Sequence, residues 1–323
     1  MTIKKRYALI GVAGYVAPKH MKAIHATGGE LVAGLDISDS VGILDKYFPN
    51  CSFFTKFGRF ERYIDKLARS GNGIDYLVVC TPNHLHDTHI RYGLRIGANV
   101  ICEKPLVINP WNLTALLESE VQADLKIYTI LQLREHAAVK ELRQRVMANR
   151  DKRFNLTLTY LTARGLWYFS SWKGDKSKSG GISTNIGIHF FDMLTWIFGD
   201  VVSSEVHVHT HDRAGGFLEL EKADVKWFLS INADIFPEST HHNGMMERSL
   251  TIDNEKIDFT RGFDDLHTKS YQSILVGRGN TIHDAKSSIQ LAYDIRNAQP
   301  ILNKNRCHEL SLKKIDIHPF KKI

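Results

Sequence analysis

Residues 7–24 of the chain read YALIGVAGYVAPKHMKAI, an apolar strand that runs into a glycine-rich turn and then a helix-like segment. Gly11, Gly14 and Ala17 follow one another at intervals of three residues, a spacing related to the dinucleotide-binding fingerprint. In that fingerprint the glycines let the backbone approach a pyrophosphate at the N-terminus of the helix. The alternative is a turn that only packs the helix against the strand, and Pro18 suits the first helical turn in both cases.

A second strand favours the nucleotide interpretation. Residues 31–36 read LVAGLD, and Asp36 follows the glycines at about the 20-residue distance of the fingerprint. An acid at this place accepts hydrogen bonds from ribose hydroxyls and repels a 2′-phosphate, so the sequence predicts NAD rather than NADP. The alternative is that Asp36 caps a helix over residues 38–47.

Strands and helices then alternate, which predicts an α/β fold with a doubly wound parallel sheet of the Rossmann type. The predicted strands cover residues 75–80, 98–102 and 127–131, and the predicted helices cover residues 59–69, 89–96 and 113–123. Right-handed crossovers bring the carboxyl ends of all these strands to one edge of the sheet. At that edge we expect Gly11, Asp36, Thr81, Asn83, Glu103, Lys104 and Gln132.

The strand over residues 98–102 ends in an unusual way. Glu103 and Lys104 carry opposite charges directly after a buried apolar run, and Pro105 then ends the hydrogen-bonded ladder. Charges at the carboxyl end of a parallel strand lie where open α/β sheets bind ligands. The alternative is a solvated ion pair.

The composition limits the class of protein. A chain of 323 residues exceeds the usual size of one hydrophobic core, so we expect two domains. The net charge of +7 favours anionic partners, but no nucleic-acid-binding motif accompanies it. No apolar run approaches the roughly 20 residues that span a membrane, and residues 1–6 lack the apolar core expected of a signal peptide. With four cysteines that lack metal-binding spacing, the sequence predicts a cytoplasmic protein.

A histidine cluster at residues 84–89 does not predict a metal site. His84, His86 and His89 do not share one helix face, and no carboxylate or cysteine completes a ligand set. We expect instead that Asn83 and His86 cap a helix or contact the edge of the nucleotide.

The hydrophobic period changes in the second half of the chain. Alternating polar and apolar residues predict half-buried strands, with a hairpin turning at Asn254. These strands cover residues 155–161, 205–209, 225–231, 250–252 and 256–259. They predict an α+β domain with a large, mostly antiparallel open sheet, whose polar face is a possible subunit contact. The expected domains are therefore residues 1–134 and residues 135–323, the latter ending in a basic tail at 300–323.

Aromatic and cationic residues gather between the first two of these strands, at residues 164–175. Asn185 and His189 follow, four residues apart, so that on a helix they share one face. A helix that exposes these two side chains near its glycine-rich start is a candidate site wall. The alternative is that His189 is a core histidine.

Two motifs together resemble a known family. The residues CEKP at 102–105, and the stretch from Gly180-Gly181 through residues 185–192, resemble the glucose-fructose oxidoreductase and inositol dehydrogenase family, abbreviated Gfo/Idh/MocA. The resemblance implies an N-terminal NAD(P)-binding domain and a C-terminal α/β domain with a large sheet. It also implies that Lys104 and His189 are the catalytic pair. Asn185 departs from the aspartate of many members. This departure alters the proton relay, so that either His189 is oriented differently or Asn185 holds a substrate hydroxyl.

Finer motifs narrow the resemblance to one branch of the family. Residues 13–20, 131–134, 171–175, 184–192 and 262–268 are similar to bacterial UDP-N-acetylglucosaminuronate 3-dehydrogenases. That branch oxidises the C3 hydroxyl of the UDP-sugar with tightly held NAD, in the biosynthesis of surface polysaccharides such as the O-antigen of lipopolysaccharide. The resemblance also implies a homotetramer and, as in some relatives, 2-oxoglutarate as the acceptor that reoxidises the cofactor. The alternatives are a 3-dehydrogenase of UDP-N-acetylglucosamine or of another sugar or cyclitol, and an NAD-binding sensor or scaffold without turnover.

The resemblance and the residue types assign expected roles. His189 acts as the general base and Lys104 stabilises the developing oxyanion, while Glu103 orients Lys104 or lines the nicotinamide pocket. Trp167, Tyr168 and Trp172 are candidates for stacking. The expected cofactor contacts are Gly11, Ala13, Gly14, Tyr15, Val16, Asp36, Thr81, Asn83, His86, Glu103, Lys104, Gln132 and Trp172. The expected substrate contacts are Lys104, Arg164, Tyr168, Lys173, Asn185 and His189.

Overall fold

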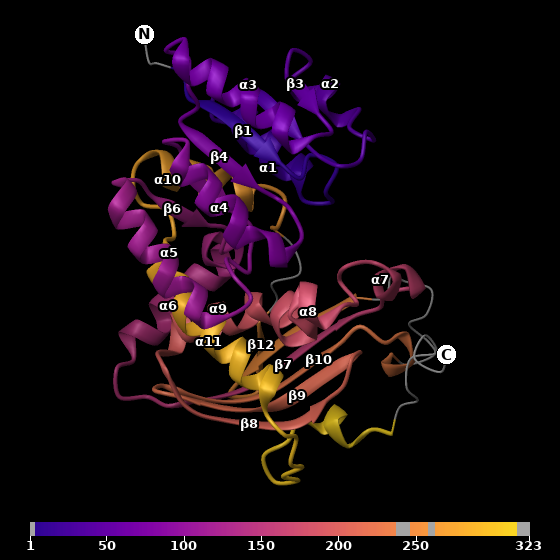
Figure 1. The fold of residues 1–323 in the computed structure, drawn as a ribbon. Helices are drawn as coiled ribbons and strands as arrows, with labels where there is room; N and C mark the ends of the chain where they lie inside the picture. Colours follow the sequence, from indigo (N-terminus) through magenta and orange to yellow (C-terminus); the bar gives the residue numbers. More distant parts are fainter. Residues whose placement is uncertain (1–3, 237–245, 258–261, 315–323) are drawn as a thin grey trace. The chain divides into compact units, whose positions relative to one another are not determined.

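The computed structural model describes residues 4–236, 246–257 and 262–314. The chain divides into two compact units, and Figure 1 shows the elements of each. The first unit combines residues 1–132 with residues 264–286, and the second combines residues 133–263 with residues 287–323. The sequence patterns suggested a single division near residue 134, and they gave no sign that a later segment joins the first unit.

The first unit is built on a six-stranded sheet in the order β3-β2-β1-β4-β5-β6, and all its strand pairs are parallel. Its strands are β1 (Arg6–Ile10), β2 (Glu30–Leu35), β3 (Ser52–Phe54), β4 (Tyr76–Val79), β5 (Asn99–Cys102) and β6 (Ile127–Thr129). Its helices are α1 (Ala17–Ala26), α2 (Ile43–Tyr47), α3 (Phe57–Arg69), α4 (His86–Arg95), α5 (Pro110–Ala123) and α10 (Leu266–Leu275), with a 3-10 turn η1 (Asn83–Leu85). The predicted doubly wound parallel sheet is confirmed.

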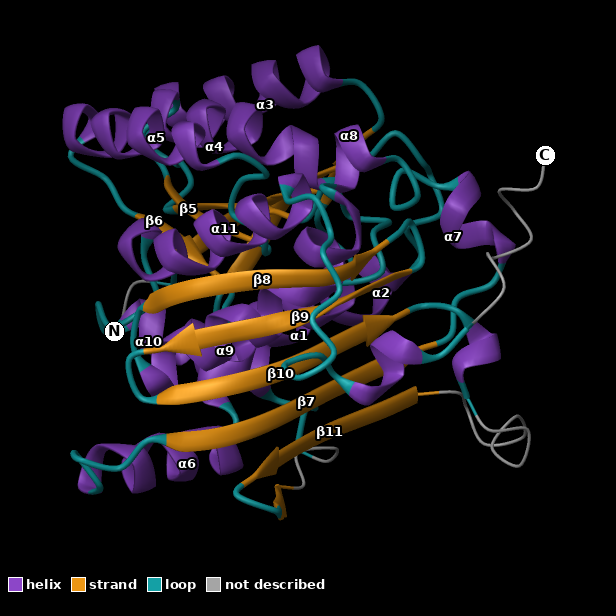
Figure 2. Cartoon of the chain, turned by 90° about the horizontal axis from the view of Figure 1, so that it is seen from below, coloured by secondary structure: helices purple, strands orange, loops and turns teal. Residues whose placement is uncertain are grey.

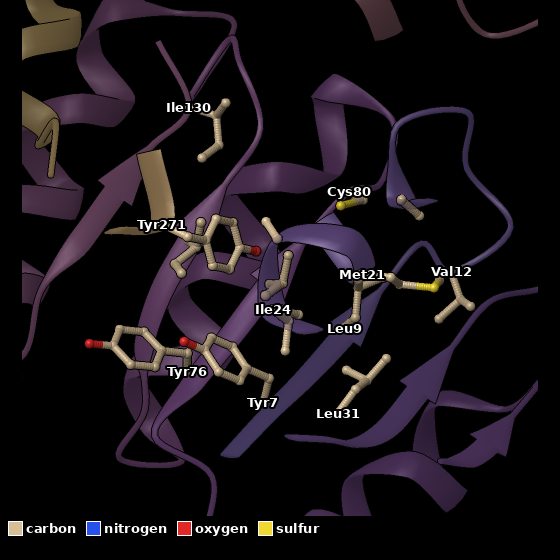
Figure 3. Packing of buried hydrophobic residues seen from close by; sticks show 14 of the residues in the cluster. Tyr7, Leu9, Val12, Met21, Ile24, Leu31, Tyr76, Cys80, Ile130 and Tyr271 are labelled. Atoms are coloured by element: carbon tan, nitrogen blue, oxygen red, sulfur yellow. The ribbon is translucent and has the colours of Figure 1, made fainter. Parts of the chain in front are cut away.

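The core of the first unit lies between α1, the sheet and α10. Leu9 and Met21 are completely buried in it, and burial of side chains of this size contributes about 1.5–3 kcal/mol each. Tyr7 stacks on Tyr76 with ring centroids 5.2 Å apart, and its ring centroid lies 6.1 Å from that of Tyr271 on α10. Figure 3 shows these three rings beside one another. The segment after residue 264 is therefore part of this core.

The second unit is built on a six-stranded sheet in the order β12-β11-β7-β10-β9-β8. Its strands are β7 (Phe154–Thr162), β8 (Val201–His209), β9 (Arg213–Leu220), β10 (Ala223–Ser230), β11 (Met246–Ile252) and β12 (Glu255–Ile257). Among the described strands of this sheet only the β7–β10 pair is parallel, so the predicted large, mostly antiparallel sheet is confirmed (Figure 2).

Helices of the second unit gather on one side of this sheet (Figure 1). They are α6 (Ala137–Ala148), α7 (Leu166–Ser170), α8 (Lys176–Ser179) and α9 (Ile188–Phe198), with a π-helical turn η3 (Ser183–Gly187) before α9. Helix α11 (Ile282–Asn297) begins in the first unit and continues in the second, and the 3-10 turns η2 (Gln132–Glu135), η4 (Ala233–Ile235) and η6 (Glu309–Leu312) complete the elements. Among the described residues, none of the helices is long and apolar enough to span a membrane.

Two strands were absent from the predictions. Strand β9 contains Gly215 and Gly216, and glycine weakens a strand pattern. At Gly216 a Cβ atom would lie 2.1 Å from the carbonyl oxygen of Glu205 on β8, so the sheet requires glycine there. The three-residue strand β3 is too short to show a period. The predicted hairpin is confirmed, with Asp253 and Asn254 at positive φ in its turn, although residues 258 and 259 lie outside the described residues.

Candidate functional site

The glycine turn after β1 is as tight as the sequence suggested. Gly11 has a φ of +94°, and a Cβ there would lie 2.7 Å from the carbonyl carbon and oxygen of Cys80. At Gly14 a Cβ would lie 3.0 Å from the Gly11 carbonyl oxygen, to which the Gly14 N–H donates at 3.0 Å. Helix α1 begins at Ala17, and no side chain caps its first N–H groups. A glycine turn that leads into an uncapped helix suits an anionic diphosphate.

Asp36 closes this turn from the end of β2. Its Oδ2 atom accepts a hydrogen bond from the N–H of Ala13 at 2.9 Å, and its Oδ1 atom accepts one from Ser38 at 2.9 Å. The alternative role of Asp36 as a helix cap is wrong, because the helix predicted over residues 38–47 is only α2, which begins at Ile43. The acid therefore lies at the glycine turn, where a dinucleotide places its ribose.

The buried side chain of His86 fixes the loop after β4. The His86 ring is fully buried, with Nε2 2.8 Å from the carbonyl oxygen of Thr81 and Nδ1 2.7 Å from that of Pro105. Burial lowers the pKa of His86 despite these two acceptors. His86 thus ties the loop after β4 to the turn that follows Lys104. Its expected contact with the nucleotide stays a prediction.

The expected cofactor contacts differ in their exposure. Tyr15 is 90% exposed, so its ring is available to a ligand at the glycine turn. Partly exposed are Ala13, Gly14, Val16, Asp36, Thr81, Lys104, Gln132 and Trp172, and buried are Gly11, Asn83, His86 and Glu103.

Glu103 is the centre of a network that the sequence patterns did not reveal. Its Oε1 atom lies 2.9 Å from Nε2 of His20 on α1 and 2.9 Å from Nε2 of His267 on α10. Its Oε2 atom accepts a hydrogen bond from the backbone N–H of Lys104 at 3.2 Å. Burial alone would raise the pKa of the Glu103 carboxyl, but the hydrogen bonds from the two histidines outweigh it and hold the pKa well below its usual value.

In the second unit, Asn185 and Tyr168 are direct partners. The Asn185 side-chain amide donates a hydrogen bond to the Tyr168 hydroxyl at 2.8 Å, and both residues are buried. Burial raises the pKa of Tyr168, so the phenol stays protonated. Asn185 lies in the π-helical turn η3, and His189 is the second residue of α9. The prediction that one continuous α-helix carries both residues is therefore wrong. Such π turns are frequent at functional sites.

His189 keeps part of its surface exposed, although Ile188 and Phe190 beside it are buried. Its catalytic role stays a prediction. Three residues later, Asp192 forms a buried ion pair with Arg134, at 2.7 Å between Nη2 and Oδ1. The ion pair joins α9 to the turn before α6, and it explains the aspartate at the end of the 184–192 motif as structural.

The aromatic and cationic residues near residue 170 come together as expected. The Lys173 ammonium lies 5.4 Å from the centroid of the Trp167 ring and 4.9 Å from that of Trp172. Burial, and then the charge of Arg164, lower the pKa of Lys173. The cluster offers two cations and two indole faces, which are groups that bind anions and flat rings.

Comparison with known proteins gives this geometry a context. Residues 5–130 match the Gfo/Idh/MocA family described as "Oxidoreductase family, NAD-binding Rossmann fold". Residues 153–229 match its "Oxidoreductase family, C-terminal alpha/beta domain". The crystal structure of the WlbA (WbpB) dehydrogenase from Thermus thermophilus is 44% identical in sequence with a TM-score of 0.90, over 94% of this chain and 99% of that one. The chain belongs to the Gfo/Idh/MocA oxidoreductase family.

The Thermus thermophilus enzyme was crystallised in complex with NAD and UDP-GlcNAcA, and also in complex with NAD and alpha-ketoglutarate. Two curated relatives match less of this chain. D-glucoside 3-dehydrogenase of Escherichia coli is 25% identical over 251 residues, which are 74% of this chain and 67% of that protein. The 1,5-anhydro-D-fructose reductase of Ensifer adhaerens is 24% identical over 198 residues, 60% of this chain and 57% of that protein. The chain thus spans about half to two thirds of the length of these curated relatives.

The chain is an NAD-dependent oxidoreductase, and the first unit fits that cofactor. The glycine turn brings backbone N–H groups to a place where a side chain would clash, and the Asp36 carboxylate lies beside it. The carboxylate suits the unphosphorylated ribose of NAD.

Proposed function

We propose that this protein oxidises the C3 hydroxyl of UDP-N-acetyl-D-glucosaminuronic acid to the 3-keto sugar with NAD, in nucleotide-sugar biosynthesis for a surface polysaccharide. The main support is the 44% identity, over 94% of the chain, to a Thermus thermophilus dehydrogenase crystallised with NAD and UDP-GlcNAcA. A curated relative named D-glucoside 3-dehydrogenase is consistent with chemistry at the same sugar position.

Oxidation of a secondary alcohol needs a base for the hydroxyl proton while a hydride leaves the carbon. NAD, when bound, accepts that hydride. His189 takes the proton on a ring nitrogen, and its partial exposure leaves the imidazole accessible to a substrate. The Lys104 ammonium stabilises the negative charge that develops on the sugar oxygen. The turn of Lys104 is tied down on both sides, by the contacts of Glu103 and of Pro105.

The second unit supplies groups for the rest of the substrate. Arg164 and Lys173 bind the uronate carboxylate or the diphosphate, and the faces of Trp167 and Trp172 stack on the uracil, the sugar or the nicotinamide. Desolvation of Lys173 between two indole rings supports this role, because a partly buried cation lacks the water that would compete with a bound anion. Asn185, in η3, and its hydrogen-bond partner Tyr168 supply polar groups for the substrate.

Three further features belong to the proposal. 2-Oxoglutarate reoxidises the bound NADH, which is supported by the complex of the Thermus thermophilus enzyme with NAD and alpha-ketoglutarate. The protein is a homotetramer that acts in the cytoplasm. Analytical ultracentrifugation tests the oligomer, and addition of 2-oxoglutarate to the reduced enzyme tests the acceptor by loss of NADH absorbance.

The proposal is tested with purified protein, NAD and a panel of UDP-sugars, followed by NADH absorbance and by mass spectrometry of the keto product. We expect turnover of the uronate, and about 10²–10⁴-fold lower kcat in His189→Asn, with NAD still bound. Lys104→Ala should show a comparable loss. Wild-type rates in either variant would refute the assignment.

The same assay separates the uronate from its parent sugar. UDP-N-acetylglucosamine lacks the carboxylate, so preference for the uronate should fall in Arg164→Ala if Arg164 binds that group. Equal rates with both sugars in the wild type would favour the alternative 3-dehydrogenase of UDP-N-acetylglucosamine.

A further inference from the structure

The contacts of Glu103 assign a task to two histidines outside the catalytic pair. Three elements of the first unit meet at this carboxylate: α1 supplies His20, α10 supplies His267, and the turn after β5 supplies Glu103 itself. Both histidines are at least 95% buried, and Glu103 is 7% exposed. Burial of a carboxylate costs free energy unless its oxygens accept hydrogen bonds, and the hydrogen bonds from the two imidazoles offset that cost for Glu103.

The partners fix the protonation of each group. An ionised carboxylate only accepts hydrogen bonds, so His20 and His267 must each present an N–H at Nε2. Nδ1 of neutral His20 is then an acceptor, and the Tyr271 hydroxyl lies 2.8 Å from it and donates. The directions of the pKa shifts agree with this arrangement: burial lowers the pKa of His20 and raises that of Tyr271, while the pKa of Glu103 is held low.

The second carboxylate oxygen of Glu103 connects this network to Lys104. Oε2 accepts the backbone N–H of Lys104, so a carboxylate held by two imidazoles also holds the peptide from which the Lys104 side chain projects. We infer that His20 and His267 are positioning residues, which fix the ionised Glu103 carboxylate and through it the placement of Lys104. The inference rests on the catalytic role of Lys104 in the proposed function.

A divalent cation is the competing interpretation of the same three side chains. One ring nitrogen of His20, one ring nitrogen of His267 and a carboxylate oxygen of Glu103 lie within 4.8 Å of one another, as metal ligands would. The hydrogen bonds favour the positioning role, because they already satisfy both oxygens of Glu103 and both nitrogens of His20. Metal analysis of the purified enzyme therefore belongs to the test.

The experiment compares two substitutions at His267 in the full-length enzyme with bound NAD. The side-chain amide introduced by His267→Gln reaches where Nε2 lies and keeps an N–H donor, whereas His267→Leu removes it. We expect kcat to fall about tenfold in His267→Leu, the equivalent of one hydrogen bond to a charged group, and to stay within about threefold of wild type in His267→Gln. The KM for the UDP-sugar and the Kd for NAD should change less than about twofold in both, because neither histidine is assigned to binding.

Ile274→Ala is the control for simple destabilisation of α10. Ile274 lies on the same helix and is 2% exposed, in the apolar core rather than the network. The Ile274→Ala substitution should lower the melting temperature of the enzyme and leave kcat unchanged. If His267→Leu does not fold, His267→Asn takes its place, because the shorter amide keeps polarity but cannot reach Glu103.

The outcomes separate this inference from the proposed function. Wild-type kcat in His267→Leu, or equal losses in His267→Leu and His267→Gln, would overturn the positioning role while Lys104→Ala still shows its large loss. A stoichiometric divalent metal that disappears in His267→Leu would overturn it in favour of a metal site. If Lys104→Ala itself keeps full activity, the proposed function fails first and the positioning role fails with it.

Discussion

The substitution Asp36→Asn tests how the first unit selects its cofactor. Each oxygen of the Asp36 carboxylate accepts one backbone N–H, from Ala13 and from Ser38, both at 2.9 Å. Asparagine has one carbonyl oxygen, so one of these bonds is lost, at a cost to folding of about 1.5 kcal/mol because the site is partly exposed. The larger effect should fall on the cofactor.

The expected change in preference follows from two contributions. Loss of the charged acceptor for the ribose hydroxyls weakens the binding of NADH by about 1.5–3 kcal/mol. Loss of the negative charge relieves a repulsion with the 2′-phosphate of NADPH of about 1–4 kcal/mol, for unit charges about 4 Å apart at a partly exposed site. The ratio of the two dissociation constants should therefore shift towards NADPH by at least about sixtyfold.

Titration of the nicotinamide fluorescence measures both dissociation constants. The matched control is Asp39→Asn, which removes the same charge from an exposed position three residues further on. An unchanged NADH to NADPH ratio in Asp36→Asn would refute the reasoning, as would an equal shift in Asp39→Asn.

Three other predictions concern stability and the second unit. Gly11→Ala should destabilise more than Gly28→Ala in urea unfolding, because both residues have positive φ but only at Gly11 does the new Cβ meet backbone, at 2.7 Å; equal losses would contradict this. His308 has a pKa lowered by burial from 6.5 to about 4, and its Nδ1 accepts a backbone N–H. Protonation therefore favours the unfolded chain, so stability is complete above pH 6.5 and falls by about 3 kcal/mol as the pH drops towards 4; His308→Gln should flatten this slope. Tyr168→Phe removes the acceptor of the Asn185 amide and should lower kcat/KM about fivefold without affecting NAD binding, whereas an unchanged value would remove the pair from the site.

Most of the first unit, apart from β3 and the segment after residue 264, could be predicted from sequence because its signals are local. A buried parallel strand is recognised by its short apolar run. The other signals are also local: the glycine turn, Asp36 at the end of the second strand and the helices of this unit can each be recognised within about 20 residues of sequence. Within the second unit, the alternation of β7 and β10 was equally plain, but the two glycines of β9 broke the pattern. The spacing of Asn185 and His189 indicated that they are neighbours, yet a spacing of four does not distinguish an α-helix from a π-helical turn.

The Glu103 network lay beyond sequence reasoning for a different reason. His20 and His267 lie 83 and 164 residues from Glu103, and no period or motif spacing joins them. The one hint was that residues 13–20 and 262–268 both carry the resemblance to one branch of the family. Only the return of α10 to the first unit brings the two stretches together.

The most direct measurement uses UDP-N-acetyl-D-glucosaminuronic acid deuterated at C3, mixed with the purified enzyme and NAD in a single turnover. The proposed chemistry predicts that the deuterium appears on the reduced nicotinamide, as a mass increase of about one unit, and that the transfer is slower than with unlabelled sugar. Reduced nicotinamide that carries no deuterium, or the absence of any reduction, would contradict oxidation at C3.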